Sequence, residues 1–104
     1  MTDSELLALS ARAHGGLEYV DEMGWIHVNP DGTRGAWWNP LTNDGDALRL
    51  SVRLGISVYL MYEDRVCADR AGIREYWEYS QNDLYSATRR VIVTAAAAIG
   101  KEVP

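Results

Sequence analysis

The sequence predicts an α+β fold, in which a small antiparallel sheet of about four to five strands packs with three helices as a single layered domain over residues 1–104. Helix-capping signals followed by apolar spacing occur near the start, in the middle and at the end of the chain. Between them lie short β-branched and aromatic runs, whose connections are too short for parallel crossovers. A chain of 104 residues is also long enough for one hydrophobic core.

The N-terminal part is expected to form a helix and then short strands. Residues 2–5 supply a helix cap, and the glycine pair at 15–16 ends the helix. Strands are expected at 17–20 and 25–28. The turn at 29–32 follows, where Pro30 fixes φ and Gly32 tolerates a positive one. Residues 33–38 form either a third strand or an extended approach to the next segment.

A second helix is expected to run to about Leu54 and to end at Gly55. Pro40 keeps the residue before it extended, so the helix begins later. Three residues compete as its cap: Thr42, Asn43 and Asp44. One apolar face is formed by Ala47, Leu50 and Leu54. An adjacent flank carries Leu48 and Val52.

The C-terminal part is expected to contain strands and a last helix. The strongest strand pattern covers 56–62, and a turn leads to a second strand at 65–68. Residues 73–79 fit either a strand or a short helix, and we favour a strand. Asn82 or Asp83 caps a helix that runs to about Ile99 and ends at Gly100. Its buried face consists mostly of small side chains, which allow close packing against a sheet.

Two segments carry a resemblance to known proteins. Residues 38–50 match the pattern W-N-P-L-T-x-D-G-D-A-L-R-L, and residues 85–100 match Y-x-A-T-R-R-x-I-V-x-A-A-A-x-I-G. In both, the chain resembles a group of small phage and prophage proteins of unknown function. The resemblance implies an accessory protein that binds a host protein, with components of CRISPR-type defence among the candidates. It implies no catalytic activity.

Charge and composition exclude several classes of function. Fifteen acidic against ten basic residues give a net charge of -5, which disfavours general nucleic-acid binding and suits a basic partner. Cys67 is the one cysteine, so no intramolecular disulfide forms, as is usual in a reducing compartment. Neither a signal peptide nor an apolar run of membrane-spanning length is present. We expect a protein of the bacterial host cytoplasm without a membrane partner.

No motif predicts a metal, a cofactor or a catalytic residue. Asp44 and Asp46 resemble the start of a calcium loop, but the fifth and sixth positions of that loop are Leu48 and Arg49. These acids are better explained as helix caps. A zinc site needs more ligands at closer spacing than the scattered His14, His27 and Cys67 provide. Neither a nucleophile elbow nor a glycine-rich phosphate loop occurs.

Aromatic rings and arginines remain as candidates for function. Tyr, Trp and Arg anchor protein interfaces, which makes the following rings candidate protein-interaction residues: Trp37, Tyr59, Tyr62, Tyr76, Trp77 and Tyr79. An alternative is nucleic-acid or nucleotide binding, in which the rings stack on bases. In this alternative the residues that contact the nucleic acid are Arg65, Arg70 and Arg74. Core packing of the rings is a third interpretation, and a homodimer also stays open.

Overall fold

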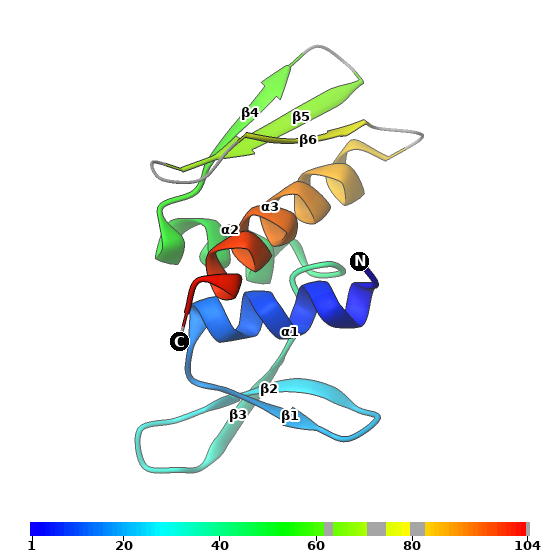
Figure 1. Cartoon of the computed structure of the whole chain (residues 1–104). Coiled ribbons are helices and arrows are strands. Elements are labelled where there is room, and N and C mark those ends of the chain that lie inside the picture. Colours follow the sequence, from blue (N-terminus) through cyan, green and yellow to red (C-terminus); the bar gives the residue numbers. More distant parts are fainter. Residues whose placement is uncertain (62–63, 71–74, 80–82, 104) are drawn as a thin grey trace.

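The computed structural model describes residues 1–61, 64–70, 75–79 and 83–103. Within these residues the chain forms three helices and six strands (Figure 1), which are α1 (Asp3–His14), β1 (Leu17–Val20), β2 (Gly24–Val28), β3 (Arg34–Trp38), α2 (Asp44–Leu54), β4 (Ser57–Met61), β5 (Arg65–Asp69), β6 (Tyr76–Tyr79) and α3 (Leu84–Lys101). The strands pair antiparallel in two sheets of three, ordered β1-β2-β3 and β4-β5-β6.

The helices lie between the two sheets. Helix α3 packs along α1 on one side and against β5 and β6 on the other, while α2 lies beside α3. Figure 1 shows β4-β5-β6 above α3 and β1-β2-β3 below α1. The molecule is therefore elongated along this stack, with principal extents of 44 × 29 × 23 Å.

This arrangement confirms an α+β fold with antiparallel strands but corrects the expected single sheet of about four to five strands. The α1–α3 helix pair lies between the two three-stranded sheets, so the sheets cannot join edge to edge. Two of the unresolved choices are settled. Residues 34–38 form a strand, and so do Tyr76–Tyr79 in the segment that fitted either a strand or a helix.

Local capping explains where the helices begin. Thr2 and Glu5 form a reciprocal capping box at the start of α1. The side chain of Asn43 accepts a hydrogen bond from the backbone N–H of Asp46 at 2.8 Å, and Asp83 caps α3 in the same way. Gly55 ends α2 with a left-handed φ of 68°.

Gly100 does not end α3, as the sequence suggested, but lies inside it. A Cβ atom built on Gly100 would lie 1.9 Å from the backbone oxygen of Leu9 in α1. Any larger residue would therefore push the two helix backbones apart. Gly100 is a point of close contact between α1 and α3, and the helix continues to Lys101.

The segment between β3 and α2 joins the lower sheet to the helices. Trp38 is buried in the main core, and its ring centroid lies 5.6 Å from that of His14 in α1. Just after it, the backbone N–H of Asn39 donates to Oδ2 of Asp46 at 2.9 Å. Asp46 is itself buried and also accepts from Arg49 at 2.9 Å. The segment fixes how the chain passes from strand to helix.

Candidate functional site

The strand register of β4-β5-β6 gathers aromatic side chains on the face that points away from the helices. Tyr59, Cys67 and Trp77 form one row across the three strands, and Met61, Arg65 and Tyr79 form the next. Side chains alternate along a strand, so Val66 and Ala68 of β5 point the other way and are fully buried in the core. We call the outward set the aromatic face, comprising Tyr59, Met61, Arg65, Cys67, Trp77 and Tyr79.

The rings of the aromatic face are substantially exposed. Tyr59 is 47% exposed, Trp77 45% and Tyr79 60%. The guanidinium carbon of Arg65 lies 5.3 Å from the centre of the Tyr79 ring, a distance at which cation and ring attract each other. The result is a ridge of large side chains held at fixed spacing by the strands beneath.

The charge around the aromatic face is acidic or balanced. Nε of Arg65 forms an ion pair with Asp64 at 3.2 Å. Glu75 and Asp69 lie close enough to Cys67 to raise the pKa of its thiol, although burial is the larger cause. The charge of Arg65 is thus offset locally by Asp64.

Cys67 is the buried centre of this face. It is only 3% exposed although it points away from the helices, because it lies between Tyr59 and Trp77 in the register. A thiol whose pKa is raised is a weak nucleophile at neutral pH. Cys67 is thus a buried thiol flanked in the register by two candidate contact residues.

The structure separates the predicted interaction residues into different places. Tyr59, Trp77 and Tyr79 come together on the aromatic face with Arg65. Tyr76 lies on the opposite face of the sheet and packs against the core, so it is not part of the aromatic face. Arg70 follows β5 and is half-buried. The remaining two candidates, Tyr62 and Arg74, lie outside the described residues.

Trp37 lies on the other sheet, on the face of β1-β2-β3 that points away from α1. It is 49% exposed and pairs across the strands with Ile26, which is buried but belongs to no part of the main core. On the same face, Arg34 forms an ion pair with Glu18 at 2.9 Å. The Trp37 ring thus helps to cover Ile26, and it is remote from the aromatic face.

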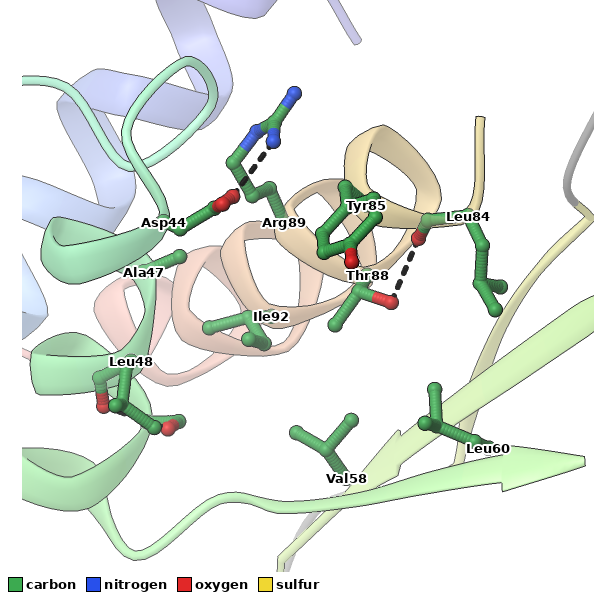
Figure 2. Close-up of a pocket in the computed structure, with 11 residues that line it drawn as sticks. Asp44, Ala47, Leu48, Val58, Leu60, Leu84, Tyr85, Thr88, Arg89 and Ile92 are labelled. Carbon is green, nitrogen blue, oxygen red and sulfur yellow. Dashed lines mark hydrogen bonds and ion pairs between the residues drawn. The ribbon is translucent and has the colours of Figure 1, made fainter. Parts of the chain in front are cut away.

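A pocket that sequence reasoning missed opens between α2, α3 and β4, with a volume of about 500 Å³. Figure 2 shows Leu48 of α2, Ile92 of α3 and the β4 residues Val58 and Leu60 lining it. At one end Arg89 bridges α3 to α2 by donating to Asp44 at 2.6 Å (Figure 2). Arg89 also donates to the carbonyl of Leu41, just before α2, at 2.8 Å. Leu48, on the flank of α2 away from its main apolar face, was the one sequence signal for this pocket.

His14 and His27 form the closest pair of titratable rings in the lower half, with centroids 5.7 Å apart. Burial lowers the pKa of His14, although a 2.5 Å hydrogen bond from Nδ1 to the carbonyl of Gly15 opposes this effect. Among the described residues, no three His, Cys, Asp or Glu side chains gather as they would around a metal ion.

Comparisons of the chain with protein-family models, with curated proteins and with solved structures give no match. In the part of the chain that the structure describes, no helix combines the length and the apolar character that a membrane span requires.

Proposed function

We propose that this chain is a non-enzymatic binding protein that contacts a partner protein through the aromatic face. The observation that carries the proposal is the row of half-exposed rings on β4 and β6, turned away from the core by the strand register. Tyr and Trp supply large contact areas with few rotatable bonds, so fixing them on binding costs little entropy. The sheet holds their spacing before the partner arrives.

The aromatic face is the size of an interface centre. Three strands of five residues or fewer, at the usual strand spacing and rise, cover roughly 14 Å by 17 Å. A standard interface buries about 800 Å² on each partner, with the strongest contacts near its middle. The rings therefore provide the strongest contacts, and neighbouring surface provides the surrounding rim.

Charge favours a protein over a nucleic acid as the partner. Arg65 is paired with Asp64 and lies over Tyr79, and Asp69 and Glu75 lie nearby. A phosphate backbone would meet these acids and the net charge of -5. A partner with neutral or basic character at the contact is electrostatically complementary.

The resemblance of residues 38–50 and 85–100 to phage and prophage accessory proteins extends the proposal. On that basis the partner is a host protein in the bacterial cytoplasm, and the first candidates to test are components of host defence systems such as CRISPR-Cas. The resembling segments lie in the corner before α2 and in α3 rather than on the aromatic face. These segments support the proposal that the chain is a phage accessory protein, and the exposed rings support the proposal that it binds through the aromatic face.

The test is affinity capture from host lysate with wild-type protein and with a Tyr59→Ala, Trp77→Ala variant. Trp37→Ala is the matched control, because it removes an equally exposed Trp from the other sheet. We expect one specific protein to be captured by the wild type and the control and to be lost with the double variant. Capture that survives the double variant, or binding to DNA at low salt that weakens steeply as salt rises, would contradict the proposal.

A further inference from the structure

Strand β4 is an edge strand without the usual protection against further pairing. In the described sheets the edges are β1, β3, β4 and β6. Three of them carry a charged residue, namely Glu18, Arg34 and Glu78, whereas β4 reads Ser-Val-Tyr-Leu-Met. Charged side chains on edge strands, especially those that point inward, discourage the addition of another strand. By this criterion β4 is open to pairing.

The other edge of the same sheet shows the contrast. Glu78 of β6 lies on the inward face, opposite Val66 in the register, and lies 3.8 Å from Nε of Arg90 on α3. The equivalent inward position on β4, also opposite Val66, is Leu60. The β6 edge therefore carries an inward-pointing charge that pairs with an arginine of α3. The β4 edge carries an exposed aliphatic side chain instead.

The backbone of β4 has hydrogen-bonding capacity to spare. Within the described residues β4 pairs with β5 alone, so every second residue turns its N–H and C=O toward the open side. These groups favour an extended partner, because a helix has already used its own backbone hydrogen bonds.

The pocket lies where the side chains of an added strand would point. Helix α3 packs beneath β5 and β6, and α2 extends the helical layer past the edge of the sheet. Leu60 on β4 is 63% exposed and Leu48 on α2 is 62% exposed, on opposite walls of the pocket (Figure 2). Val52, one turn further along α2, is 74% exposed. The helical layer is thus wider than the sheet that covers it.

We propose that β4 and this pocket bind an extended segment of a partner protein, which adds as a fourth strand and seats alternate apolar side chains between β4 and α2. A volume of about 500 Å³ accommodates a few side chains. The inference rests on the proposed function in one respect, that the partner is a protein. It uses residues outside the aromatic face, except that β4 also carries Tyr59 and Met61.

Charge decides between a foreign segment and a second copy of this chain. A second copy carries the same net charge of -5, which opposes self-pairing. Asp64, although ion-paired with Arg65, is exposed just beyond the end of β4, and Asp69 of β5 lies opposite Ser57 at the start of β4. The complementary occupant is an apolar strand flanked by basic residues.

The experiment selects ligands from a displayed library of random 12-residue peptides on the wild-type protein. We expect selected peptides with apolar residues at every second position and basic flanks. Leu60→Lys gives β4 the inward charge that Glu78 gives β6, and Leu48→Glu alters the opposite wall. Both positions are exposed, so both variants should fold. Each should weaken peptide binding at least tenfold, while Met23→Lys, at an exposed apolar position in a turn of the other sheet, should not.

Hydrogen exchange of the bound protein tests the geometry, with slower exchange expected at the amides of residues 57–61 and not at those of β6. Selection of no peptide, binding unaffected by both variants, or a concentration-dependent dimer abolished by Leu60→Lys would overturn the inference. Trp77→Ala should leave peptide binding intact. If Trp77→Ala abolishes host-protein capture but the library yields no peptide ligand, this inference alone is refuted. If peptides are selected but host-protein capture does not depend on Trp77, the proposed function alone is refuted.

Discussion

The two sheets have the same number of strands and the same antiparallel order, but they place most of their large rings on opposite faces. In β1-β2-β3 the inward face carries Trp25 and the buried Trp38, next to His14 of α1. In β4-β5-β6 the centre of the inward face is formed by Val66 and Ala68, which pack beneath the small-residue helix α3.

The difference shows how helix packing determines which side chains are left for binding. A helix rich in alanine lies close to its sheet, so little space remains between them for a large ring. Tyr59, Trp77 and Tyr79 are directed outward, whereas Tyr76 packs inward at the edge strand β6. Of the four tryptophans, Trp38 stabilises the fold, and Trp77 is the one we assign to binding. Four predictions test this comparison, from the largest expected effect to the smallest.

The largest effect is expected from Trp38→Ala, because Trp38 is a buried ring that joins β3 to the helices. Removing a buried Trp typically costs about 3–5 kcal/mol. Urea unfolding should show a loss of this size, whereas Trp77→Ala should lower the free energy of unfolding by about 1 kcal/mol or less, as for surface positions. Equal losses in the two variants would mean that Trp77 also supports the fold.

Gly100→Ala should destabilise the contact that holds the two halves together. The new methyl group would meet the backbone of α1, and overpacking of this kind costs about 1–3 kcal/mol. Gly35→Ala in β3 is the control, since a Cβ atom there would have its nearest neighbour, Oδ1 of Asn29, at 3.4 Å, an ordinary contact distance. In thermal unfolding the first change should lower the melting temperature and the second should not. A neutral Gly100→Ala would contradict the close α1–α3 contact.

Cys67 reports on the aromatic face directly. Trp77→Ala should uncover the thiol and increase its rate of reaction with a disulfide reagent several-fold in native protein at pH 8, while Trp37→Ala should leave the rate unchanged. The reaction is followed by absorbance, and denatured protein gives the upper limit. An unchanged rate in the Trp77 variant would mean that this ring does not cover Cys67.

The smallest effect is expected from pH. Burial holds the pKa of His14 below its ordinary value near 6.5, so the unfolded chain takes up a proton more readily than the folded protein. The contribution of neutral His14 to the free energy of unfolding is therefore fully present above about pH 6.5. It decreases as the pH falls toward the lower pKa of His14 in the folded protein. His14→Gln should make the unfolding free energy depend less on pH between pH 7 and 5. The same pH dependence in both proteins would exclude His14 as its source.

Local signals predicted most elements but not their assembly. The caps at Thr2, Asn43 and Asp83 depend on neighbouring residues, so the sequence located each helix start to within a few candidate residues. The split into two sheets depends on how α1 packs against α3, which is a contact between distant parts of the chain. Gly100 illustrates the limit, because a glycine near a helix end usually terminates it, yet here the approach of α1 explains the glycine.

The candidate site shows the same limit. Alternation along a strand places Tyr76 on one face and Trp77 with Tyr79 on the other, as the register shows. It could not indicate which face meets the helices, since that depends on the packing of α3. The pocket was not predicted because it depends on the position of α2 relative to β4. The sequence showed the apolar flank of α2 at Leu48 and Val52, but it did not show that β4 lies across the pocket from α2.

The most direct test of the central claim is the affinity of the purified host partner for two single variants, measured by calorimetry. If the aromatic face is the binding surface, Trp77→Ala should weaken binding by roughly 30-fold, which corresponds to about 2 kcal/mol for a residue at an interface centre. Trp37→Ala, which changes an equally exposed Trp on the other sheet, should bind like the wild type. Equal affinity of all three proteins, or a loss confined to Trp37→Ala, would contradict the account.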